Sequence, residues 1–185
     1  DSVSYGCYQL MSKYLKDASA KVIGVGSGLT LKKTIKRIDF ESKNSKCVAL
    51  ISAMDENGQC NYYDDVPLLL ARKIQANYFQ WPAPRYAKSL PEYQMWSTTR
   101  LFESVTSVAD HADVIFVGIG ALGTQSTIFK DGVINTTQLE DLRERGAIGE
   151  ILGRCIDAEG QGAESDNKRL INRYDRSRNT CHRNV

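Results

Sequence analysis

The chain has 185 residues, of which 42% are hydrophobic and 25% are charged. This length is enough for one sizeable hydrophobic core and too short for two, so we expect a single domain. No run of about 18 apolar residues is present, and residues 1–21 are too polar for a secretory signal. The composition therefore excludes a membrane-spanning helix and predicts a cytoplasmic protein.

The distribution of charges and of cysteines limits which partners and cofactors the chain can bind. Residues 168–185 hold six basic residues and one acid, which leaves 18 basic and 21 acidic residues in 1–167. A mildly acidic body has no electrostatic footprint for nucleic acid, and the basic end is typical of a solvated terminus. The five cysteines are scattered, without CxxC or metal-ligand spacing. We therefore expect reduced thiols and no metal or other cofactor.

The predicted elements alternate between helix and strand. Apolar residues spaced three and four apart predict a helix over 5–15, and a strand over 21–26 then leads into a second helix. Further along the chain, strands are predicted over 46–52, 78–81, 114–117 and 151–156. Between them we predict a helix capped by Asp65 with Pro67 in its first turn, helices within 91–109, and a helix that begins at Thr137 and ends at Gly146. This alternation predicts an α/β fold of three layers, Rossmann-like, in which helices cover both faces of a mainly parallel sheet.

The segment 113–120 is the centre of this pattern. Four apolar residues, 114–117, follow an acid and run into Gly118 and Gly120, which predicts a strand buried on both faces that ends in a backbone-lined turn. Small molecules bind at such strand ends in open α/β sheets. The segment therefore indicates a pocket.

Residues 118–123 also satisfy the dinucleotide-binding pattern G-x-G-x-x-G, with Glu140 and Asp141 suitably placed downstream for a ribose contact. The pattern requires a helix directly after the glycines to hold the pyrophosphate, and 124–135 has no helical period. We instead predict an irregular loop or short hairpin over 123–135. Dinucleotide binding stays an alternative.

Residues 26–30, Gly-Ser-Gly-Leu-Thr, favour an anion site. A strand that ends in glycines and continues into a helix presents free main-chain N–H groups, and Ser27 and Thr30 add hydroxyl donors. The segment lacks the lysine and spacing of a P-loop, which argues against nucleotide hydrolysis. The alternative is an ordinary turn in which Thr30 is the helix cap.

Candidate catalytic residues are few. The only histidines are His111, expected at a helix end, and His182, in the polar terminal segment, so a histidine triad or metal site has little to work with. Four acids near element ends could pair for acid–base catalysis, with solvated loop carboxylates as the alternative: Asp55, Asp64, Asp65 and Asp157. Asp157 is the strongest candidate, because it ends a strand that could run beside the central one.

Five segments of the chain, in the order 22–30, 81–84, 112–121, 146–153 and 157–160, form a recognisable set. Together they resemble the effector-binding domain of SorC-family transcriptional regulators, which control bacterial sugar operons. The resemblance implies an α/β sensor domain, similar to sugar-phosphate isomerases and coenzyme A transferases, that binds a sugar or sugar phosphate and forms dimers or tetramers. Operator DNA would bind to a helix-turn-helix domain outside this chain. A sugar-phosphate-processing enzyme with the same site is the alternative to this non-enzymatic role.

Carried over by position, the resemblance implies a ligand site built from four segments and one acid. Its members are Gly26, Ser27, Gly28, Leu29 and Thr30 at the phosphate or hydroxyl end, Ala53 and Met54 beside them, Pro82, Ala83 and Pro84 at the rim, Gly118, Ile119, Gly120 and Ala121 in the wall, and Asp157 as acceptor for ligand hydroxyls.

The chain departs from the family pattern in two places. The family has an Asn/Ser-Gly-Gly turn where residues 52–58 read Ser-Ala-Met-Asp-Glu-Asn-Gly, which predicts a site shaped for a different ligand. Family members also continue with further strands beyond the position of Asn172, whereas the end of this chain is polar and basic. We therefore expect 1–172 to be an effector-binding domain that is incomplete at its C-terminal end, through a frameshift or premature stop. We expect 173–185 to be an aberrant, disordered tail.

Overall fold

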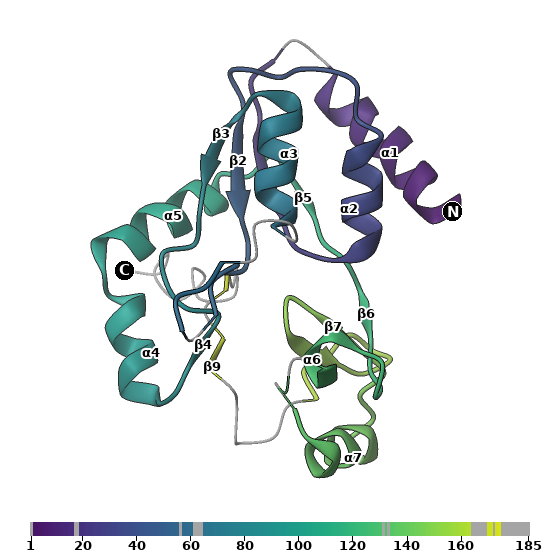
Figure 1. Cartoon of the computed structure of the whole chain (residues 1–185), viewed down its shortest axis with the longest axis vertical. Helices are drawn as coiled ribbons and strands as arrows, with labels where there is room; N and C mark the ends of the chain where they lie inside the picture. Colours follow the sequence, from purple (N-terminus) through teal and green to yellow (C-terminus); the bar gives the residue numbers. More distant parts are fainter. Residues whose placement is uncertain are drawn as a thin grey trace.

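A parallel four-stranded sheet forms the centre of the computed structural model (Figure 1), which describes residues 2–16, 19–55, 57–60, 65–130, 132, 134–163, 170–171 and 173–174. The strands are β1 (Val22–Val25), β2 (Lys46–Ala49), β3 (Asn77–Phe79) and β5 (Val114–Phe116). Their order is β3-β2-β1-β5, so β1 lies between β2 and β5. The direction in which strands are added to the sheet therefore reverses at β1.

Two hydrophobic cores lie on the two faces of this sheet, because alternate residues of each strand point to opposite sides. On one face α1 (Ser2–Leu15), α2 (Leu29–Lys36) and α3 (Val66–Ile74) enclose Ile23, Val25 and Phe116. On the other face α4 (Leu90–Ser97) and α5 (Arg100–Asp110) cover Val48 and Leu50. The predicted three-layer α/β class is confirmed.

The sequence predicted one of two helix starts correctly. Asp65 caps α3, since its side chain accepts a hydrogen bond from the Leu68 N–H at 3.0 Å, and Pro67 lies in the first turn. The helix α7 (Thr136–Glu144) begins one residue before Thr137, at an Asn135–Gln138 capping box. The predicted start at Thr137 is wrong because Asn135 is an equally good cap and comes first.

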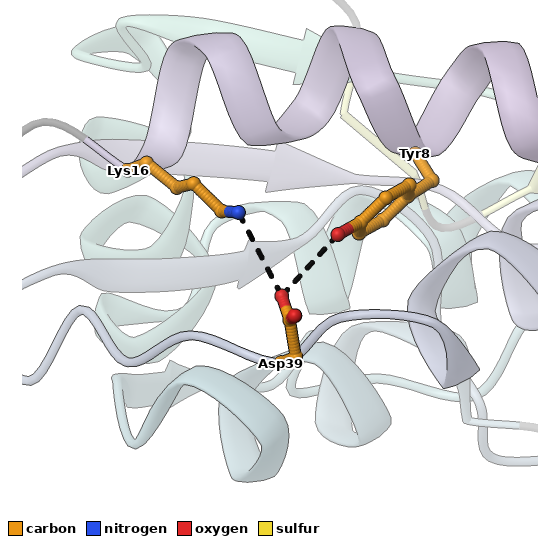
Figure 2. Close-up of polar contacts among 3 residues, drawn as sticks. All are labelled: Tyr8, Lys16 and Asp39. Atoms are coloured by element: carbon orange, nitrogen blue, oxygen red, sulfur yellow. Dashed lines mark hydrogen bonds and ion pairs between the residues drawn. The ribbon is translucent and has the colours of Figure 1, made fainter.

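The buried side chains of Met11 and Leu15 pack the inner face of α1 against the core, and contacts with Asp39 at the surface add to them. The Tyr8 hydroxyl donates to Asp39 Oδ1 at 3.3 Å, and Lys16 Nζ lies 3.8 Å from the same oxygen (Figure 2). Figure 1 shows that α1 lies beside α2 on the outside of the molecule. Because this neighbour covers a narrow face, Tyr5 and Tyr14 of the predicted apolar stripe are 51% and 48% exposed.

The strand β5 is exposed on one side. The sequence predicted burial on both faces, but Ile115 is 37% exposed, and only Phe116 of the strand is buried. The prediction is wrong because β5 is the last strand of the described sheet, and α5, on the face towards which Ile115 points, packs over β1 and β2.

A second, antiparallel sheet forms a smaller lobe after β5, at the lower right of Figure 1. It contains β6 (Gly120–Ala121), β7 (Gly149–Ile151) and β8 (Arg154–Ile156), with α6 (Thr127–Lys130) and α7 around them. The predicted single strand over 151–156 is wrong, because Leu152 and Gly153 have φ angles of 52° and 78° and turn the chain into a hairpin. Seven buried residues form this lobe's own core: Ile128, Ile134, Leu139, Leu142, Ala147, Cys155 and Ala163.

The last described residues pack against the main sheet. The strand β9 (Leu170–Ile171) pairs with β4 (Tyr86–Ala87). Arg173 then forms a bridge with Ile51, and the Tyr174 side chain is buried, with its hydroxyl 2.9 Å from Asp110 Oδ1. The fold therefore includes the first two residues of the predicted tail, while 175–185 lie outside the described residues.

Two further expectations concern composition. Within the described ranges, no helix has the length and hydropathy needed to cross a membrane, and no cluster of metal-ligating side chains is present. Cys7, Cys47, Cys60 and Cys155 form no disulfide with one another. Burial, together with the Asp65 charge, raises the pKa of Cys47 to about 12. Asp64, Cys181 and His182 lie outside the described residues.

Candidate functional site

The four predicted ligand-binding segments all follow the carboxyl ends of parallel strands. Residues 26–30 follow β1, 53–54 follow β2, 82–84 follow β3 and 118–121 follow β5. These strands are neighbours in one sheet, so their ends lie along one edge. The predicted adjacency of the two glycine-bearing strand ends is confirmed, because Val25 of β1 pairs with Phe116 of β5. A reversal in strand order is the place where an open α/β sheet forms a binding crevice.

The end of β1 leaves main-chain N–H groups without a side-chain acceptor. The buried Gly26 donates its N–H to the Phe116 carbonyl at 2.9 Å, and the chain becomes exposed from Ser27 to Thr30. Gly28 is the N-cap of α2, with φ 129° and ψ 152°, and no side chain caps this helix. The alternative in which Thr30 is the cap is therefore wrong. The first-turn N–H groups and the helix dipole favour an anion or a hydroxyl at this point.

The end of β5 is more closely packed. A Cβ atom on Gly118 would lie 2.9 Å from the main-chain carbonyl oxygen of Ser27, so no side chain fits there without movement. Gly120 pairs with Glu150 across β6 and β7, and the Glu150 side chain fills the space beside it. Ile119 between them is 75% exposed. These glycines allow protein segments to approach each other.

The same segment excludes the dinucleotide-binding geometry. Gly120 continues into β6, and the next helix, α6, begins only at Thr127 and has four residues. No helix N-terminus follows the glycines directly to hold a pyrophosphate. The prediction that the pattern fails on its structural context is confirmed.

A buried serine joins the ends of β2 and β3. Ser52 is completely buried, its hydroxyl donates to the Ala83 carbonyl, and it accepts a hydrogen bond from the Met54 N–H at 3.1 Å. This arrangement places the predicted rim, Pro82 to Pro84, against the predicted Ala53–Met54 segment. Sequence analysis missed Ser52, although a hydroxyl directly after a buried strand is a usable signal.

The β7–β8 hairpin contacts the same edge from the small lobe. The Leu152 Cδ2 atom lies 3.0 Å from the position that a Cβ on Gly26 would occupy, and Leu152 packs against the core beneath α5. The Glu150 carboxylate is held nearby through its Oε2 atom, which accepts from the Gly153 N–H at 2.7 Å. Sequence analysis selected neither residue, and its continuous strand over 151–156 did not allow for the turn at Leu152.

Asp157, unlike the other predicted site residues, does not follow a strand of the main parallel sheet. It follows β8, which pairs with β7 and not with β5, so the predicted strand beside the central one is wrong. Its Oδ1 atom accepts from the N–H groups of Glu159 and Gln161, at 3.1 and 2.7 Å.

Asp55 makes the same contacts in its own loop, with the N–H groups of Asn57 and Gln59 at 2.9 and 2.8 Å. Both loops read Asp-x-x-Gly-Gln, and each is closed by a glycine with positive φ, Gly58 and Gly160. The two carboxylates therefore stabilise loops, which removes the geometric support for either of them as a catalytic base.

Residues 1–172 match the family model described as "Putative sugar-binding domain". The chain belongs to this sugar-binding domain family. The resemblance to SorC-family regulators, based on five sequence segments, is therefore confirmed at the level of the family.

Relatives of this sugar-binding domain include the erythritol catabolism regulatory protein EryD from Brucella abortus (strain 2308), which is 26% identical over 156 residues. The match covers 84% of this chain and 49% of EryD, so the chain spans about half the length of that relative.

Solved structures of transcriptional regulators share the fold. A DeoR family transcriptional regulator from Listeria monocytogenes superimposes with a TM-score of 0.74 at 22% identity, covering 92% of this chain and 64% of that one. The full-length sorbitol operon regulator SorC from Klebsiella pneumoniae gives 0.73 at 18% identity, covering 92% and 56%. These similarities concern the fold. The five-segment resemblance also predicts an origin in a sorbose-operon regulator, and these similarities do not test that prediction.

Proposed function

We propose that this domain binds a sugar or sugar phosphate at the carboxyl edge of β1, β2, β3 and β5, and that the bound molecule is the effector of a transcriptional regulator. Membership of the sugar-binding domain family carries the proposal. The neighbouring ends of β1 and β5 support this location of the binding site, since the strand order reverses between them.

In this proposal, residues 1–172 are the effector-binding domain of a cytoplasmic regulator that forms dimers or tetramers. Operator DNA binds to a helix-turn-helix domain outside this chain. Effector binding changes the relative stability of assemblies that differ in DNA affinity, which couples the two sites. The loop contacts of Asp55 and Asp157 support a binding role without catalysis.

The exposed segment Ser27 to Thr30 contacts the ligand in this proposal. Its uncapped helix N-terminus presents N–H donors, and the Thr30 hydroxyl lies in the first turn of α2. A phosphate or hydroxyl group can therefore accept from main-chain and side-chain donors at one place.

Thermal unfolding in the presence of four- to six-carbon sugars, polyols and their phosphate esters tests this function. A ligand at about 100 times its Kd stabilises the folded state by about 2.7 kcal/mol. We expect at least one compound to raise the Tm without being converted. Turnover of the compound would support the enzymatic alternative, and a Tm unchanged by the whole panel would contradict the proposal.

Thr30→Val then tests the position of the site. Loss of the donor at nearly constant volume is expected to cost about 1.5–3 kcal/mol of binding to a charged ligand group. Thr137→Val is the matched control, because Thr137 occupies the same second position of α7 in the small lobe and is also exposed. Equal affinities of both variants and the unmodified protein, measured by calorimetry, would place the ligand elsewhere.

A further inference from the structure

Arg85 is tied to the loop after β2 through both its main chain and its side chain. Its N–H donates to the Met54 carbonyl at 2.7 Å, and its Nε donates to the Ser52 carbonyl at 2.9 Å. The side chain therefore runs from Met54 back towards the end of β2. Arg85 follows the predicted rim directly, and sequence analysis did not select it.

The guanidinium of Arg85 is partly buried and has no carboxylate partner within the described ranges. Ion pairs among the described residues include those of Lys16, Lys43 and Arg145, all on the surface. A guanidinium carries five N–H donors, and the bond to Ser52 uses the one on Nε. The two Nη atoms remain available to bind an anion.

The hydrogen bond from Arg85 to the Ser52 carbonyl does not by itself require a positively charged side chain at position 85. A neutral side chain such as glutamine also donates to a main-chain carbonyl, without the cost of partly burying an ion. Arginine adds a planar pair of Nη groups, whose orientation is fixed when Nε is held. This geometry matches phosphate and carboxylate oxygens in a bidentate contact.

The carbonyl that Arg85 binds follows β2, the strand next to the one that leads into the uncapped helix α2. Val25 of β1 pairs with Ala49 of β2, so the chain ends that follow these strands, at Gly28 and Ser52, leave the sheet side by side. Neighbouring strands are about 4.8 Å apart. The guanidinium bound to Ser52 and the uncapped N-terminus of α2 therefore both lie at the carboxyl edge of the sheet, after the adjacent strands β2 and β1.

We propose that Arg85 binds the anionic group of an acidic sugar derivative, either a phosphate ester or a sugar acid, at the carboxyl edge of the sheet. This inference rests on the proposed function and narrows it, because the site then prefers a charged derivative over its neutral parent. Arg85 acts by direct bidentate contact, with the α2 N-terminus as the second donor.

Calorimetry with matched triplets tests the proposal. Each triplet contains one four- to six-carbon polyol or sugar in three forms: neutral, as its terminal phosphate ester and as its terminal carboxylate. We expect the unmodified protein to bind one of the two anionic forms at least about tenfold more tightly than the neutral parent, as for a charge-assisted hydrogen bond. The form that binds more tightly distinguishes an ester from a sugar acid.

Arg85→Gln is expected to weaken binding of that anionic form by about 10- to 100-fold and to change binding of the neutral parent by less than about twofold. Arg72→Gln is the matched control, because it removes the same charge from the last turn of α3, whose C-terminal end precedes β3 and so lies at the opposite edge of the sheet. The control is expected to bind like the unmodified protein.

The outcomes separate the two proposals. No binding of any form by the unmodified protein contradicts the proposed function itself. Equal binding of neutral and anionic forms, or an unchanged anion preference in folded Arg85→Gln, overturns the role of Arg85 and leaves sugar binding intact. If circular dichroism shows that Arg85→Gln is unfolded, Arg85→Lys replaces it as the test variant. Lysine keeps the positive charge but cannot make the bidentate contact of the guanidinium. An Arg85→Lys protein that binds the anion as tightly as the unmodified protein overturns the proposal.

Discussion

Two glycine-bearing strand ends lie side by side in this protein and use their glycines differently. After β1, Gly28 has open space where a Cβ would stand, and the helix that follows begins without a side-chain cap. After β5, the corresponding positions of Gly118 and Gly120 are occupied by the Ser27 carbonyl and the Glu150 side chain. The first end has open space beside Gly28, whereas at the second the glycines allow protein segments to pack. Glycine after a strand therefore indicates that another group comes close to the main chain, but not whether that group is a ligand or another protein segment.

The largest expected effect is that of Gly118→Val. The new side chain would meet a main-chain oxygen, which moves only with its strand end, so overpacking is expected to cost at least about 1–3 kcal/mol of folding free energy. Urea denaturation measures the loss. Gly6→Ala is the control, since its Cβ would meet open space inside α1. An unchanged urea midpoint for Gly118→Val would show that the two strand ends are not in contact.

Gly28→Ala is expected to cost about 1–3 kcal/mol for a different reason. Space is free at this position, but φ 129° with ψ 152° lies in a region that is essentially restricted to glycine. The same urea experiment measures the cost. A variant as stable as the unmodified protein would mean that the turn before α2 adopts another conformation at no cost, and the comparison with Gly118 would then fail.

Gly120→Ala is expected to be milder, at about 0.5–1.5 kcal/mol, because the obstacle is the flexible Glu150 side chain. A double-mutant cycle with Glu150→Ala isolates this contact. We expect Gly120→Ala to be nearly neutral when Glu150 is already truncated. The same loss in both backgrounds would assign the cost to the main chain and not to Glu150.

The smallest expected effect on stability is that of Thr30→Val. Thr30 is exposed and does not cap α2, so its substitution is expected to change the folding free energy by less than about 0.5 kcal/mol while weakening ligand binding. Chemical denaturation without ligand checks this value. A loss above about 1 kcal/mol would show that the hydroxyl has a structural role, and the binding result could then not be assigned to ligand contact.

Local chemistry made much of the fold predictable. Asp65 and Pro67 define the start of α3 within four residues of chain, and the apolar runs around Val25, Val48 and Phe116 define the strands of the main sheet. The twin Asp-x-x-Gly-Gln loops are also local, because each aspartate bonds to N–H groups two and four residues ahead. The family resemblance rested on the same kind of local segments in a fixed order.

The errors have a common origin in contacts between distant parts of the chain. Val114, Ile115 and Phe116 read as a fully buried strand, but burial of Ile115 depends on which elements lie beside β5. Asp157 was preferred as a catalytic acid or base because its strand was expected to join the main sheet, and the turn at Leu152 and Gly153 pairs that strand with β7 instead. Short apolar runs look alike whichever strand they pair with.

The sequence by itself determined most of the element types, the cap of α3, the α/β class and the family, because each depends on interactions within a few residues or on an ordered set of short motifs. Only the tertiary structure decided which strand ends meet, which glycines are open, and that Arg85 lies against Ser52. The physical reason is that strand pairing and side-chain burial are properties of contacts across the chain, and Ser52 and Arg85 are brought together by the packing of β2 against β3.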